Sequence, residues 1–130
     1  MEPPKNAELV ETRTSISWLE DNGILCSISK KAPEPTVEES KRDIEDFKRR
    51  YGNQKFCMLM DITHSTPSSK EMRDWAAEEL PKLVKAIAMI SNSPLGRMVA
   101  NLFFGLKPPP YPTKMFSNEH DAREWLKQYL

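Results

Sequence analysis

Two short, uninterrupted apolar runs limit the folds that this chain can adopt. Phe56–Met60 and Ala86–Ile90 contain no charged or polar residue, so neither shows the apolar–polar alternation of a strand with one solvated face. Continuous runs of this kind are typical of strands covered on both faces, as in a parallel sheet flanked by helices. The segment between them has helical apolar spacing at Met72, Trp75 and Ala76. The sequence therefore predicts two parallel strands joined by a helical crossover.

The N-terminal part of the chain predicts an antiparallel hairpin. Apolar residues alternate with others on both sides of Asp21-Asn22-Gly23, within residues 15–28. An Asn-Gly step between alternating runs is a strong hairpin signal, because both residues accept the positive φ that a tight turn requires. Extended chain is expected just before the hairpin, around Leu9–Thr12.

Capping boxes predict the start of two helices. Thr36 with Glu39 precedes an amphipathic segment that ends at Gly52, and Ser68 with Glu71 precedes the helix between the two apolar runs. In this motif the hydroxyl group accepts a bond from the third backbone N–H of the helix, and the glutamate bonds back to the cap. The charged face of the first helix is interpreted as a solvated surface with acid–base pairs four residues apart.

The C-terminal third predicts two more helices and an edge strand. Ser93-Pro94 is expected to cap a helix that runs to about Gly105, a short strand should lie near Thr113–Phe116, and Asn118 should cap the last helix. This order favours a single α/β domain over residues 1–130. Its mixed sheet opens with an antiparallel hairpin and continues with parallel strands, and helices pack on it.

Composition argues against several classes of function. Lys plus Arg and Asp plus Glu each number 19, so no net charge draws the chain to nucleic acid or to an anionic membrane. The four glycines are isolated, which leaves no phosphate loop or dinucleotide motif. Cys26 and Cys57 lie inside apolar runs and the two histidines are far apart, so we expect no disulfide, metal or other cofactor. With no apolar leader or membrane-spanning stretch, a cytoplasmic protein is predicted.

Several stretches of the chain resemble a group of small bacterial proteins that is similar to the STAS domain. They are Trp18–Leu25, Met58–Thr63, Ala86–Ser91, Arg97–Phe104, Pro112–Phe116 and Ala122–Leu126. The STAS fold is that of sulfate-transporter tails and of anti-sigma-factor antagonists, the SpoIIAA-like proteins, and the group also resembles lipid-binding CRAL-TRIO domains. The resemblance implies a SpoIIAA-like fold and a non-enzymatic protein-interaction or signalling module.

The same resemblance implies a phosphorylated serine. In anti-sigma-factor antagonists a strand ends in Asp, and the serine that a partner kinase phosphorylates lies at the start of the next helix. Asp61 matches that Asp, and Ser68 or Ser69 is the nearest counterpart of the serine. The loop Asp61–Pro67 is longer than the compact Asp-Ser-Ser-Gly turn of the family, so this sequence departs from the pattern at the position that matters for phosphorylation.

The residues themselves suggest a candidate ligand site at one edge of the sheet. Asp61 and His64 follow a buried strand, where open α/β sheets bind ligands, and Ser93 and Arg97 should lie beside them at a helix N-terminus. Two interpretations stay open: a site for a small anionic or lipidic ligand, or a plain ion pair between Arg97 and Asp61. No catalytic role is expected for His64, because residues so close in sequence seldom converge as nucleophile and base.

The predicted third helix has more apolar area than one helix face can bury. Its regular stripe should already meet the sheet, and Phe103 and Phe104 add aromatic rings beyond it. Together with Met98 they predict an association surface, and a homodimer is its simplest form. The alternative is that the proline-rich segment after Lys107 folds back and covers the two rings.

Overall fold

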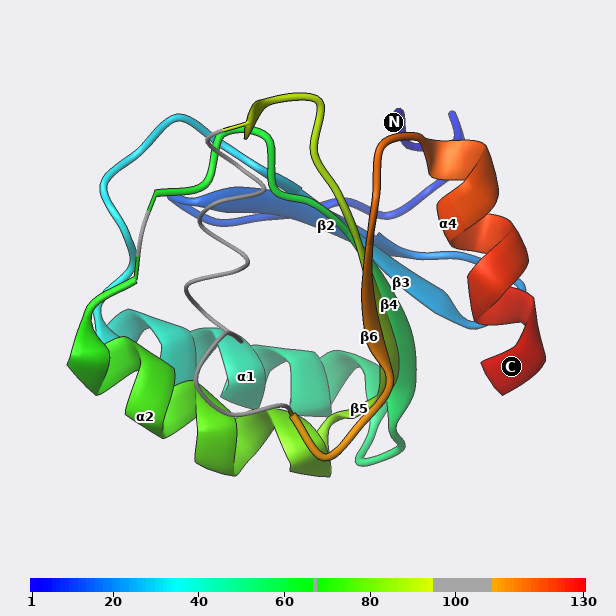
Figure 1. The fold of residues 1–130 in the computed structure, drawn as a ribbon. Helices are drawn as coiled ribbons and strands as arrows, with labels where there is room; N and C mark the ends of the chain where they lie inside the picture. The colour runs from blue at the N-terminus through cyan, green and yellow to red at the C-terminus, as the bar shows by residue number, and fades with distance from the viewer. Residues whose placement is uncertain (67, 95–108) are drawn as a thin grey trace.

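The computed structural model describes residues 1–66, 68–94 and 109–130, which form a six-stranded mixed sheet with helices on both faces (Figure 1). Neighbouring strands pair antiparallel from β1 to β3 and parallel from β3 to β6, so the predicted mixed sheet is confirmed. The strands follow one another across the sheet in chain order: β1 (Val10–Glu11), β2 (Ser15–Leu19), β3 (Ile24–Ser29), β4 (Phe56–Asp61), β5 (Val84–Ile90) and β6 (Thr113–Phe116).

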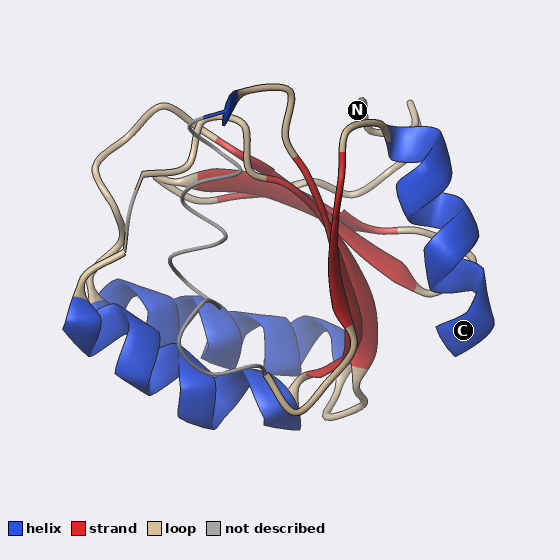
Figure 2. Ribbon diagram, viewed as in Figure 1, coloured by secondary structure: helices blue, strands red, loops and turns tan. Residues whose placement is uncertain are grey.

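The helices divide between the two faces of this sheet (Figure 2). Helices α1 and α2 cover one face, and α4 covers the other. The crossovers from β3 to β4 and from β4 to β5 advance the same way across the sheet, so a common handedness places both of their helices on one side. The helical segments are α1 (Val37–Tyr51), α2 (Lys70–Glu79) with a 3-10 turn at Leu80–Lys82, and α4 (Glu119–Leu126) with a 3-10 turn at Lys127–Tyr129.

The hairpin and the first cap form where predicted, although within the Asn-Gly step only Gly23 has a positive φ. Gly23 has a φ of 92°, and the Asn22 side chain accepts a bond from the Ile24 amide at 3.1 Å. At the start of α1, Thr36 Oγ1 accepts from the Glu39 amide, and a Glu39 carboxylate oxygen accepts from the Thr36 amide, each at 3.1 Å. The local sequence signals therefore fix both the first turn and the first helix.

The predicted cap of α2 is wrong by one residue. Ser69, not Ser68, accepts a bond from the Met72 amide at 3.2 Å, and the helix begins at Lys70. Two adjacent serines offer the same chemistry, but their backbone groups have different partners. Glu34 accepts from the Ser69 amide at 2.9 Å, while the Ser68 carbonyl accepts from Arg73 at 2.6 Å.

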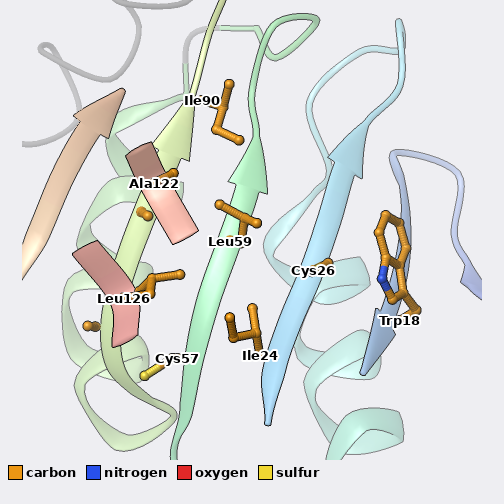
Figure 3. Close-up of a cluster of buried hydrophobic side chains, with 10 residues drawn as sticks. Trp18, Ile24, Cys26, Cys57, Leu59, Ile90, Ala122 and Leu126 are labelled. Atoms are coloured by element: carbon orange, nitrogen blue, oxygen red, sulfur yellow. The ribbon is translucent and has the colours of Figure 1, made fainter. Parts of the chain in front are cut away.

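The main core lies between the sheet and α4 (Figure 3). Side chains from four strands converge there on Ala122 and Leu126 of α4, both of which are fully buried. Small residues on β5 let the helix lie close to the sheet, which favours dense packing. The buried members are Trp18, Ile24, Cys26, Cys57, Leu59, Ala86, Ala88, Ile90, Ala122 and Leu126.

The two cysteines belong to this core as unpaired thiols. Burial raises the pKa of Cys26 to about 12, so its thiol is neutral and unreactive at neutral pH. Within the described ranges no group of metal-ligating side chains comes together, and no helix is long and apolar enough to cross a membrane. The predicted third helix, with Arg97, Met98, Phe103 and Phe104, lies outside the described residues.

Candidate functional site

A cavity of about 350 Å³ lies between the sheet and the helices α1 and α2. Its volume falls within the range of about 300 to 1,000 Å³ that is typical of small-molecule sites. The residues around it come from four strands, both helices and the loops that follow β3 and β4. The cavity therefore reaches the carboxyl ends of the parallel strands, the edge at which the sequence predicts a ligand site.

The strand pleat explains why space remains on this side. Side chains alternate between the two faces of the sheet, and those of Ser27 and Ser29 on β3 and Met58 and Met60 on β4 line the cavity. Serine fills little of the distance between a sheet and a helix. Helix α1 has no fully buried residue, although Ile44 on its apolar stripe lines the cavity. A smaller core of Ile62, Val84, Ile87 and Met89 lies on this face, and the cavity extends beside it.

Methionine is the dominant apolar side chain of the lining. Met58 and Met60 of β4, Met89 of β5 and Met72 of α2 all border the space, together with Trp75. Methionine is flexible and polarisable, so a surface made of it adapts to ligands of different shape. The arrangement favours an apolar molecule over a small polar one.

Three of the four charged side chains that line the cavity are already engaged by other groups of the chain. Engaged groups have less to offer a ligand, because each charge already has a hydrogen-bond partner. The bonds join Lys30 Nζ to a Glu11 carboxylate oxygen at 2.6 Å, the Ser69 amide to Glu34 at 2.9 Å and the Thr63 amide to Asp61 at 3.0 Å.

The fourth charged side chain, Asp43 of α1, differs from the other three. It is half-buried and accepts no hydrogen bond from any described residue. Burial raises the pKa of Asp43, and the neighbouring charges of Glu39 and Asp46 add to this effect, whereas Arg42 opposes it. No buried side-chain oxygen lacks a hydrogen bond among the described residues, so the Asp43 carboxylate oxygens are in contact with solvent. It is the one lining charge within the described ranges that is left for a ligand.

Arg13 fixes one rim of the cavity. Its guanidinium donates to both carboxylate oxygens of Glu39, at 2.8 and 2.9 Å, and to the carbonyl oxygens of Pro33 and Glu34. The hydrogen bonds from Arg13, followed by that from the Thr36 backbone, lower the pKa of Glu39 to about 2. This network ties the loop after β3 to the start of α1, and both segments border the cavity.

The structure brings together only part of the site predicted from the sequence. Asp61 lines the cavity, and the loops after β4 and β5 lie side by side, since the Asn92 amide reaches Thr63 Oγ1 at 3.5 Å. His64 is exposed and does not line the cavity. Ser93 is not a lining residue either, and its amide donates to Ser91 Oγ at 3.2 Å.

Of the remaining predicted site residues, some are described by the structure and others are not. Ser68 borders the cavity, and Ser69 is exposed at the N-cap of α2, whereas Arg97 and the predicted interface of Met98, Phe103 and Phe104 lie outside the described residues. The ion pair between Arg97 and Asp61, the homodimer and phosphorylation therefore stay predictions.

Sequence reasoning missed the methionine lining and Asp43. The alternating methionines of β4 were interpreted only as part of a buried strand. Asp43 follows Ser40 by three residues and precedes Phe47 by four, which places it at the border of the apolar stripe of α1. A carboxylate at that border is the feature of the sequence that could have marked Asp43 as a candidate site residue.

Comparisons with known proteins agree with this fold. The model of a family described as "Domain of unknown function (DUF7793)" matches residues 17–130. A solved structure from Shewanella loihica PV-4, described as an uncharacterized protein from the DUF3478 family with a SpoIIAA-like fold, is 20% identical, covers 97% of this chain and 98% of its own, and has a TM-score of 0.53. At this identity the likeness shows the fold alone, and that fold is SpoIIAA-like.

A second solved structure, a protein with unknown function from Arthrobacter sp. FB24, is 29% identical. It covers 85% of this chain and 97% of its own, but its TM-score of 0.32 is too low to carry an argument. No curated protein matches the chain. The resemblance to CRAL-TRIO domains stays a prediction.

Proposed function

This chain belongs to the DUF7793 family, and we propose that it binds a small, largely apolar molecule in the cavity between its sheet and helices α1 and α2. The cavity itself is the observation that carries the proposal: its volume suits a small ligand, and its lining is mainly apolar. The fold alone does not indicate whether the protein binds a ligand, because proteins of one fold have many functions. The proposed role is non-catalytic and corresponds to the lipid-like ligand that the sequence left open.

The polar groups at the edge of the cavity support an amphipathic ligand. Apolar pockets commonly combine a hydrophobic lining with a few polar groups that orient the ligand. Here the methionines of β4 and β5 provide the apolar part, and Asp43 provides a polar group. A molecule with an apolar chain and one polar end matches both parts.

Filling part of the cavity should weaken binding while the fold is retained. We expect Met60→Trp to weaken the binding of decanol by about tenfold or more, because the larger ring occupies space that the alkyl chain requires. Titration calorimetry below the aggregation concentration of decanol measures the effect. Near-ultraviolet circular dichroism checks that the variant is folded.

Met115→Trp is the matched control for this experiment. Met115 packs in the cluster of Ile62, Ile87 and Met89 on the same side of the sheet but does not line the cavity. Its variant should bind decanol as the wild type does. Unchanged affinity in a folded Met60→Trp protein, or no binding by the wild type, would contradict the proposal.

A second candidate function is the protein-interaction module implied by the SpoIIAA-like resemblance, with Ser69 as its switch. The supporting observation is that Ser69 is exposed at the N-cap of α2, where an added phosphate would meet the positive end of the helix dipole. The same phosphate would repel Glu34, which accepts from the Ser69 amide, and would release the loop after β3. Phosphopeptide mass spectrometry on protein from its native cell tests this candidate, and unmodified Ser68 and Ser69 would remove it.

A further inference from the structure

We infer that the ligand of the cavity is a single-chain amphiphile whose protonated amine binds the carboxylate of Asp43. This inference rests on the proposed function, and it adds the charge of the ligand. It keeps the lipidic ligand of the sequence prediction, gives it a positive polar end and departs from the anionic alternative. Three observations support it: the location of Asp43, the charges around the cavity and the chemistry of its apolar lining.

Asp43 is located where a ligand can reach it, and its carboxylate oxygens are open to solvent instead of being bound by the protein. It lines the cavity from α1, next to Ile44, and accepts no hydrogen bond from any described residue. A ligand that fills the cavity would displace water from this carboxylate, and a carboxylate that loses hydration normally gains a hydrogen bond or an ion pair in return. A protonated amine supplies both at once, with three N–H donors.

The charges of the described lining residues favour the same sign of ligand. Among the described residues it contains three carboxylates and one ammonium group, and that ammonium, Lys30, is bound by Glu11 and the Thr12 carbonyl. The carboxylates of Glu34 and Asp61 accept bonds from backbone amides. An anionic head group would meet repulsion and no free cation in this part of the chain, whereas a cationic one would meet attraction.

The apolar part of the ligand follows from the floor of the cavity. Met58, Met60 and Met89 lie along neighbouring strands, since Met60 is in register with Met89 across β4 and β5. Flexible thioether side chains pack well against an unbranched alkyl chain. Asp43 lines the same cavity from α1, the helix that covers this face of the sheet (Figure 1), so one molecule can reach both.

Three probes with the same alkyl chain separate the charge of the ligand from its apolar part. Decylamine, decanol and decanoate are titrated by calorimetry at neutral pH, below their aggregation concentrations. We expect decylamine to bind about tenfold more tightly than decanol, and decanoate to bind most weakly, because a charge-assisted hydrogen bond contributes about this factor. Asp43→Asn should remove the preference for the amine and leave the affinity for decanol unchanged.

The controls distinguish binding from folding. Glu45→Gln removes a carboxylate from the exposed side of the same helix and should leave all three affinities unchanged. Asp43→Asn should leave the free protein at least as stable as the wild type, because it removes a charge whose pKa burial has raised. If the asparagine variant does not fold, Asp43→Ala repeats the test with a residue of higher helix propensity.

The outcomes separate this inference from the proposed function. Equal affinity for decylamine and decanol, or a preference for the amine that persists in the folded Asp43 variants, would overturn the inference and leave the apolar site intact. Binding of none of the three probes would overturn both. A selective loss of amine binding in the Asp43 variants, with Glu45→Gln unaffected, supports the assignment of Asp43.

Discussion

Replacing Leu126 with Ala is expected to lower the free energy of unfolding by about 3 kcal/mol, the order found when a fully buried leucine is truncated. Leu126 is 0% exposed and packs on the sheet with Ala122, its neighbour one turn earlier on α4. The helix contributes few other buried side chains, so the cavity left by the substitution cannot be refilled easily. Urea denaturation measures the change.

Leu130→Ala is the control, because Leu130 is 50% exposed at the end of the same segment. It should change stability by less than about 0.5 kcal/mol. Because α4 covers the face opposite the cavity, folded Leu126→Ala protein should still bind decanol with wild-type affinity. A loss of less than about 1 kcal/mol for Leu126→Ala would show that α4 does not pack on the sheet in solution.

The second large effect is expected at the ion pair that joins α4 to the hairpin. Arg123 donates to the two carboxylate oxygens of Glu20 at 2.6 and 2.9 Å, and the Trp18 indole donates to the same carboxylate at 3.2 Å. Only 13% of the Glu20 side chain and 28% of the Arg123 side chain are exposed. Glu20→Gln should cost about 2 kcal/mol, below the range for a fully buried pair because Arg123 keeps some hydration.

This cost should depend on pH in one direction. The hydrogen bonds from Arg123 hold the pKa of Glu20 below its usual value of 4.5, against the opposing effect of burial. A carboxylate with a lowered pKa in the folded state stabilises the fold fully above its unfolded pKa and loses that contribution as the pH falls through the folded value. The difference between wild type and Glu20→Gln should therefore be constant near neutral pH and shrink in acid.

Glu124→Gln provides the matched control on the same helix. Glu124 pairs with Lys127 at 2.7 Å on the exposed surface, where such pairs contribute little. A Glu20→Gln variant as stable as Glu124→Gln at neutral pH would show that the pair with Arg123 does not anchor α4.

The strands and helices were largely predictable, because local patterns determine them. The continuous apolar runs of β4 and β5 and the Asn-Gly turn lie where the sequence indicates. The cap of α2 was not predictable to the residue. Ser68 and Ser69 are chemically alike, so the sequence pattern does not distinguish them. In the structure the Ser69 amide donates to Glu34, and the Ser68 carbonyl accepts from Arg73.

The candidate site was predictable only as an edge of the sheet. Asp61 marks that edge in the sequence and lines the cavity in the structure. The cavity itself arises from how serines on β3 and methionines on β4 face α1, and this depends on pairing between segments that are distant in the sequence. Asp43 becomes a candidate only when its lack of a partner among the described residues is known.

Methyl NMR of the methionines tests the proposed cavity most directly. Each of the seven methionines carries one methyl group that NMR can observe. Among the described methionines, some line the cavity and others do not. On titration with decylamine, we expect saturable shifts at the lining residues and unchanged signals from Met1 and Met115. The residues expected to shift are Met58, Met60, Met72 and Met89. Shifts that are equally large at Met115, or no shift at the four lining methionines, would contradict the account.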